Sequence, residues 1–131
     1  MSTYTQGIKI DGTMFDIPLV SIKRTADVLD KYAERTEDGD LKREVLGVYF
    51  NFQLSIGTID DDNLYESLWD KLTEPVDFHD FELPITNGIH KFRGYISSVS
   101  DEIEKVYSDT AKFKGLSCKF TAKKPARIPG G

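Results

Sequence analysis

Hydrophobic and polar residues alternate most cleanly between Gly47 and Gly57. The apolar positions are every second residue: Val48, Phe50, Phe52, Leu54 and Ile56. The intervening positions are polar, apart from the ring of Tyr49. Because a period of two places alternate side chains on opposite faces of a strand, we predict the central strand of a sheet with one covered face.

The residues before this strand predict two hairpins. Short apolar segments flank Asp11-Gly12, and Asp-Gly favours a two-residue turn between strands. Residues 19–29 alternate less regularly, and their spacing also fits one face of a helix. We prefer a strand that pairs with residues 47–57 through the polar connection 34–40, which contains the Gly39 of a turn. The result is a long hairpin arm with a charged tip.

One helix is predicted over about residues 61–74. The leucines of its apolar face are four residues apart: Leu64, Leu68 and Leu72. Trp69 lies beside them and is assigned to the core beneath the sheet. Acidic residues at 60–62 can cap the helix start, and Pro75 ends it.

The second half of the chain predicts further strands and turns. The strands are expected at residues 76–85, 89–98 and 112–122. A change of parity near His79-Asp80 suggests a bulge, Asn87-Gly88 predicts a type I′ turn, and Gly115 is a candidate for a second bulge. The chain is expected to turn back at 108–110.

These elements predict one α+β domain over residues 1–131, mainly antiparallel. The expected architecture is a small β-sandwich or split barrel with one packed helix and a long hairpin arm. Residues 1–6 are expected to be a loose leader and residues 123–131 an extended tail.

Composition narrows the function. The net charge of −5 disfavours a protein that binds nucleic acid through its phosphates. We see no apolar run of the ~20 residues needed for a membrane span and no secretion signal. A single cysteine is typical of a protein that folds in a reducing cytosol. We therefore expect no specific nucleic-acid binding and no membrane association.

The charge is unevenly distributed along the chain. Acids are concentrated at 34–40, 60–62 and 77–82, whereas the end of the chain is basic. One interpretation is solubility together with charged sheet edges. The other is charge complementarity between neighbouring subunits.

The side chains that carry chemistry form no recognisable catalytic set. His79 and His90 have no second ligand at zinc spacing and are interpreted as surface histidines. Cys118 lies on an apolar face and is interpreted as a small core residue. The carboxylates that a small hydrolase would need are Asp77, Asp80 and Glu82. Nothing in the sequence makes them converge, so we predict no catalytic residue, no metal ligand, no cofactor and no small-molecule substrate.

Three segments carry a family resemblance. They are Val-Leu-Asp-Lys-Tyr-Ala-Glu-Arg-Thr-Glu-Asp-Gly-Asp-Leu at 28–41, Leu-Trp-Asp-Lys-Leu-Thr-Glu-Pro-Val at 68–76, and Phe-Thr-Ala-Lys-Lys-Pro-Ala-Arg at 120–127. They resemble small virion proteins of tailed phages and prophages of Gram-positive bacteria, and the similarity spans roughly residues 7–128. The order of elements is also similar to that of phage tail-tube and tail-tip proteins.

The resemblance implies a non-enzymatic, ring-forming subunit of a siphophage tail tube, adaptor or baseplate. Such subunits are made in the host cytoplasm and carried in the virion, and they extend sheet edges and hairpin arms onto their neighbours. Their tube interiors tend to be acidic so that DNA can slide.

The predicted assembly arm has seven residues at its tip: Glu34, Arg35, Thr36, Glu37, Asp38, Gly39 and Asp40. No apolar residue pins this segment to its own domain, so we expect it to become ordered against a neighbour. Two alternatives stay open: a small phage-encoded protein-binding module or inhibitor, and a carboxylate-dependent hydrolase.

Overall fold

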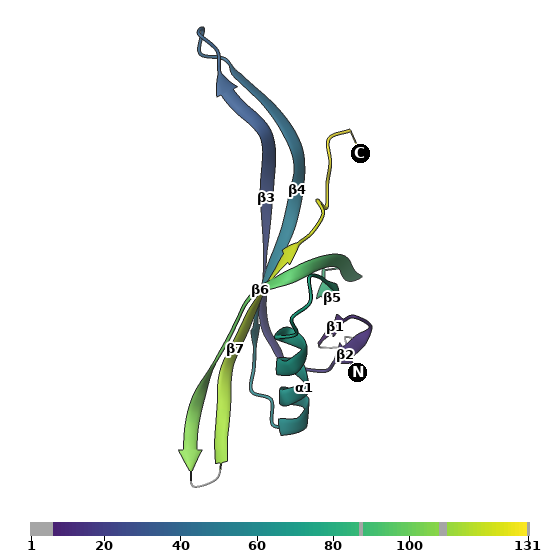
Figure 1. Cartoon of the computed structure of the whole chain (residues 1–131), viewed down its shortest axis with the longest axis vertical. Coiled ribbons are helices and arrows are strands. Elements are labelled where there is room, and N and C mark those ends of the chain that lie inside the picture. Colours follow the sequence, from purple (N-terminus) through teal and green to yellow (C-terminus); the bar gives the residue numbers. More distant parts are fainter. Residues whose placement is uncertain (1–6, 87, 108–109, 131) are drawn as a thin grey trace.

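A computed structural model describes residues 7–86, 88–107 and 110–130 (Figure 1). The strands are β1 (Ile8–Ile10), β2 (Thr13–Phe15), β3 (Leu19–Arg35), β4 (Leu41–Ile56), β5 (His79–Ile85), β6 (Gly88–Tyr107) and β7 (Thr110–Ala122), and the helix is α1 (Asp62–Leu72). The strands form one antiparallel sheet in the order β2-β1-β5-β6-β7-β4-β3. The sheet does not close on itself, and the predicted α+β, mainly antiparallel class is confirmed.

Strand β4 contains the alternating residues 48–56, for which a central strand was predicted. Phe52, Leu54 and Ile56 are at most 4% exposed, whereas Val48 and Phe50 are half-buried. Strand β4 lies second from the edge of the sheet, so its predicted central position is wrong. Its neighbour β7 pairs with it only at residues 52–55, so Val48 and Phe50 lie where this neighbour is absent.

The predicted hairpin arm is present and is longer than expected. Strand β3 continues to Arg35, and the register pairs Glu34 with Lys42 and Arg35 with Leu41. The connection is therefore 36–40 rather than 34–40. Beyond the body of the sheet, β3 and β4 continue as a two-stranded ribbon (Figure 1).

A second ribbon extends in the opposite direction (Figure 1). Strands β6 and β7 stay paired from Gly94 and Ala122 to the far pair of Tyr107 and Thr110. A register shift opposite Gly115, whose φ is +66°, confirms the predicted bulge. The turn expected at 108–110 falls largely on residues 108–109, outside the described residues.

Two tight hairpins were also predicted. Asp11 and Gly12 have φ values of 51° and 85° between β1 and β2, which confirms the Asp-Gly turn. In the β5–β6 hairpin, Ile85 pairs with Gly88, so the connection is 86–87 rather than 87–88. Asn87 itself lies outside the described residues.

Strand β5 begins at His79 and not at residue 76 as expected. Phe78 therefore precedes the strand. The change of parity marks the start of the strand rather than a bulge within it.

Helix α1 covers one face of the sheet. The Asp61 carboxylate caps it by accepting hydrogen bonds from the amides of Asn63 (3.0 Å) and Leu64 (3.2 Å), as the acidic run predicted. The core is the set of buried apolar residues that α1 and the strands share: Ile8, Ile10, Phe15, Ile17, Phe52, Leu54, Ile56, Ile59, Tyr65, Leu68, Leu72, Phe81, Leu83, Leu116, Cys118 and Phe120. Trp69 packs against this core but stays half-buried.

Candidate assembly surface

The tip of the β3–β4 ribbon is a compact loop with its own hydrogen bonds. The Thr36 amide donates to the Asp40 carbonyl (2.7 Å), and the Gly39 amide donates to the Thr36 carbonyl (2.9 Å). The Thr36 hydroxyl donates to the Asp38 carboxylate, and Arg35 Nη1 donates to the Gly39 carbonyl (3.0 Å). These contacts lie within the turn itself, and ordering of the tip against a neighbour stays a prediction.

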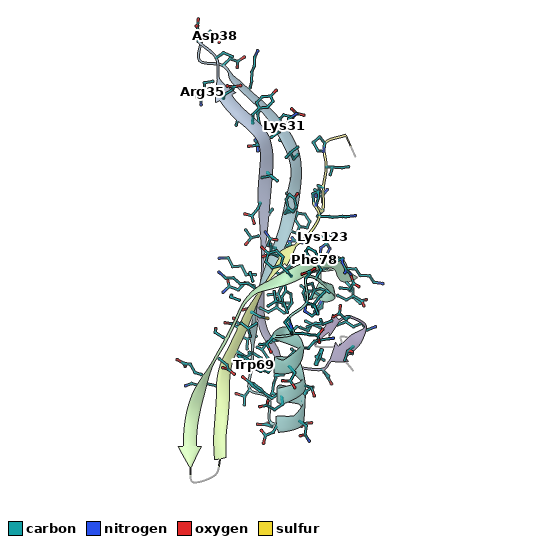
Figure 2. The ribbon with its side chains drawn as sticks, viewed as in Figure 1. Lys31, Arg35, Asp38, Trp69, Phe78 and Lys123 are labelled. Atoms are coloured by element: carbon teal, nitrogen blue, oxygen red, sulfur yellow. The ribbon has the colours of Figure 1, made fainter. Side chains whose placement is uncertain are left out.

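The same loop concentrates negative charge at the end of the molecule. Its carboxylates outnumber its single cation, Arg35: Glu34, Glu37, Asp38 and Asp40. Hydrogen bonds from the Thr36 hydroxyl and the Asp40 amide lower the pKa of Asp38, which keeps it ionised. Asp38 lies at the extreme of the long axis, far from Trp69 and the helix (Figure 2).

The ribbon behind the tip exposes apolar side chains to solvent. Five large hydrophobic residues of the ribbon are about half exposed: Val28, Leu29, Tyr32, Leu41 and Leu46. The outer edge of β3 has no neighbouring strand in the described part of the chain. An isolated two-stranded hairpin is marginally stable in water, so this surface is suited to contact with another molecule.

The C-terminal segment lies along the base of the ribbon (Figure 1). The Val48 amide donates to the Arg127 carbonyl, and the Ala126 amide donates to the Val48 carbonyl, each at 2.8 Å. A Cβ on Gly47 would lie 2.6 Å from Pro125, so glycine permits this close approach. The predicted extended tail is thus docked as an added strand-like segment.

A groove of about 390 Å³ lies between this segment, β4 and β6. Phe50 and Phe92 provide apolar surface, and Lys91, Arg93, Lys123 and Lys124 bring positive charge. We call this feature the basic groove. Lys123 and Phe78 lie together at the waist of the molecule (Figure 2), with the ammonium 4.7 Å from the ring centroid.

The cations of the basic groove are unequally neutralised. Arg93 pairs with Asp80 (3.0 Å) and Lys91 with Glu82 (3.7 Å). Lys123 and Lys124 have no carboxylate partner among the described residues.

Two more cations lie close to the groove. The guanidinium groups of Arg24 and Arg127 lie over the Phe50 ring, at 5.7 and 5.8 Å from its centroid. The surroundings of the groove therefore carry an excess of positive charge in an acidic chain.

Both histidines differ from their predicted surface positions. His90 is half-buried beside the rings of Phe52 and Phe92, each with a centroid 5.4 Å away. Burial, reinforced by the charge of Arg24, lowers the pKa of His90, so it is neutral at pH 7.

His79 is 2% exposed and lies among charged groups. Its Nδ1 donates to the Asp11 carboxylate at 2.6 Å, and the Asp80 amide donates to the same group at 2.8 Å. Burial alone would raise the pKa of Asp11, but hydrogen bonds from Asp80, His79 and Lys71 outweigh it and lower the pKa. This contact could not be predicted because Asp11 lies 68 residues from His79 along the chain.

Asp11, Glu74 and His79 offer ligand atoms within 4.8 Å of one another, a spacing that a metal ion could use. The Lys71 ammonium, however, lies 3.4 Å from a carboxylate oxygen of both Asp11 and Glu74. This ammonium already supplies the positive charge at the position where a cation would bind. We interpret the cluster as a structural link between the first hairpin, α1 and β5.

The carboxylates considered for hydrolysis lie in different settings. Asp77 lines a hollow beside the end of α1, whereas Asp80 and Glu82 pair with cations of β6. Cys118 is 1% exposed, which confirms its core position, and burial raises the pKa of its thiol to about 12.

These features define a small antiparallel α+β domain that projects long ribbons beyond its core. Comparison with solved structures finds the same fold in a chain described as "Virion of native gene transfer agent (GTA) particle", with a TM-score of 0.55 and 15% identity. The alignment covers 99% of each chain. No family model and no curated protein matches the sequence. No helix in the described residues is long and apolar enough to cross a membrane.

Proposed function

We propose that this chain is a non-enzymatic structural subunit of the tail of a phage, a prophage or a related particle. It acts as a tube, adaptor or baseplate component and associates with copies of itself, in rings, or with other tail proteins. The contacts are made by sheet edges and the hairpin arm. The subunit is made in the host cytoplasm and ends in the virion.

The observation that carries the proposal is the β3–β4 ribbon. Strand β3 is 17 residues long and has an open outer edge in the described structure. A monomer would leave this edge and the half-exposed apolar side chains of the ribbon in water. Because proteins usually cover or shorten such edges, a long exposed one favours a protein whose edge is covered on assembly.

The fold comparison supports the same proposal. The matched chain belongs to a structure titled as a virion particle, and the likeness extends over the full length of both chains. The domain and its ribbon are therefore compatible with a place in a virion. The resemblance of segments 28–41, 68–76 and 120–127 to tail proteins points the same way.

The experiment compares the molar mass of the purified protein, by light scattering over a wide concentration range, with that of two double variants. Val28→Lys/Leu46→Lys adds charge to the exposed ribbon, and Val76→Lys/Ile89→Lys adds equal charge to exposed sites outside it. We expect mass to rise with concentration in the parent and the control, and to stay near that of a monomer in the ribbon variant.

Two results would count against the proposal. A parent that stays monomeric, alone and with copurified tail proteins, would contradict it and favour a small protein-binding module. Equal assembly of all three proteins would show that the ribbon is not the contact surface.

A further inference from the structure

We propose that the basic groove binds the acidic ribbon tip, residues 34–40, of a second copy of this chain. This inference rests on the proposed function and names the partner of the arm. The occupant follows from the charge of the two surfaces and from the distance between them.

Charge favours the pairing. The tip presents four carboxylates against one arginine, and the lowered pKa of Asp38 keeps that group ionised. The basic groove presents Lys123 and Lys124 without carboxylate partners in the described structure. Opposite potentials on two surfaces increase the rate of encounter and fix the register of docking.

The distance between the tip and the basic groove requires that the two surfaces in contact belong to different molecules. Phe50 lines the basic groove, and Leu41 begins β4 beside the tip. The nine steps between them, at a rise of about 3.3 Å per residue, separate the surfaces by about 30 Å. The ribbon is continuous over this distance, with paired residues on both strands, so the tip cannot fold back onto its own groove.

The pairing also determines the kind of assembly. The tip and the basic groove are different surfaces of one chain, so their contact is heterologous and each bound copy still offers a free tip or a free groove. Repetition gives a ring where the rotation between copies closes and an open series where it does not, with a step on the order of 30 Å along the ribbon. A stack of subunits with the ribbons along its axis satisfies this geometry.

The C-terminal segment has a defined part in this contact. It supplies Lys123 and Lys124 and forms one wall of the groove. Its position depends on the backbone bonds to Val48 and on the space left by Gly47. The basic groove is thus built by three segments that are distant in sequence.

The test is disulfide trapping between two variants, Glu37→Cys at the tip and Lys124→Cys in the groove. The native Cys118 is 1% exposed and does not interfere. We expect the mixture to form a disulfide-linked dimer about tenfold faster than a mixture of Glu37→Cys with the exposed control Lys114→Cys. The difference should shrink as salt rises from about 0.05 M to about 0.5 M, because exposed charges are screened.

Charge reversal makes the test specific. When Lys91→Glu/Lys123→Glu is added to the Lys124→Cys protein, we expect the rate advantage of disulfide formation to be lost. When Glu34→Lys is then added to the Glu37→Cys protein, we expect the advantage to return. The matched control Lys114→Glu/Lys119→Glu changes the net charge equally and should leave trapping unchanged.

Three outcomes would overturn the inference. Assembly of the parent without preferential trapping would reject the tip-to-groove contact and leave the proposed function intact. Absence of both assembly and trapping would contradict both. Tight binding of a fluorescent single-stranded oligonucleotide, lost in Lys91→Glu/Lys123→Glu while trapping is absent, would assign the groove to nucleic acid.

Discussion

Strand β4 offers a direct test of how the core is arranged, because three neighbouring residues differ in burial. Phe52 is 3% exposed and lies against Phe92 and His90, with ring centroids 5.3 and 5.4 Å away. Truncation of a buried Phe to Ala costs about 3–5 kcal/mol, through lost burial and the cavity left behind. Gln53 is on the solvent face, where substitutions stay within about 0.5 kcal/mol.

The assay is urea unfolding followed by tryptophan fluorescence, since Trp69 packs against the core. With a slope of about 2 kcal/mol per molar, a loss of 4 kcal/mol lowers the midpoint by about 2 M. Phe52→Ala should therefore show a large shift, Phe50→Ala a smaller one because its ring is half-buried, and Gln53→Ala almost none. Equal shifts for Phe52→Ala and Gln53→Ala would mean that both faces of β4 are covered, and would refute this arrangement.

Three further substitutions test individual contacts. Tyr65→Phe should destabilise by about 1–2 kcal/mol, because it removes the 2.6 Å hydrogen bond to Asp101 and leaves that acceptor without its partner. Asp11→Asn keeps a residue suited to the turn but removes the negative charge. Because the pKa of Asp11 is lowered in the folded protein, the charge stabilises the fold above pH 3.8, and this stabilisation is lost as pH falls through the folded-state pKa. Gly94→Ala should destabilise strongly, because its Cβ would lie 2.2 Å from the Thr121 carbonyl oxygen.

The midpoint of urea unfolding is the measurement that tests each of these three variants. A Tyr65→Phe protein as stable as the parent would show that the hydrogen bond from Tyr65 in α1 to Asp101 in β6 does not stabilise the fold. For Asp11→Asn, a cost that persists unchanged well below pH 3.8 would show that charge is not its cause. A folded Gly94→Ala protein with an unchanged midpoint would contradict the close packing of β6 against β7.

The elements that could be predicted are those whose burial leaves a periodic pattern. The alternation at 48–56 identified a strand because one face is buried from Phe52 onward, and the leucine spacing identified α1 for the same reason. The Asp-Gly turn was predictable because left-handed backbone favours those residues.

The length of the β3–β4 ribbon could not be predicted from the sequence. Residues 30–35 and 41–46 are exposed or half-exposed on both faces, so no burial imposes a period of two on them. Their strand geometry comes from pairing between segments and not from a local pattern. The predicted connection was too long for this reason.

The candidate site was predictable only in part. The acidic tip was evident as a run of charge, but the basic groove combines residues of β4, β6 and the C-terminal segment. The burial of His79 depends in the same way on a turn far from it in sequence. Such contacts are fixed by the tertiary fold, which spacing along the chain does not report.

The central claim is that the ribbon serves assembly and not the stability of the domain. No residue from 30 to 46 belongs to the core, and Leu29 pairs with Gly47, so an Asn-Gly turn can replace this segment between them. The decisive measurement is sedimentation velocity of this shortened protein and of the parent at matched concentrations, with their melting temperatures recorded. We predict nearly equal melting temperatures, large assemblies for the parent and a monomer for the shortened protein. Assemblies of the same size from both proteins would contradict it.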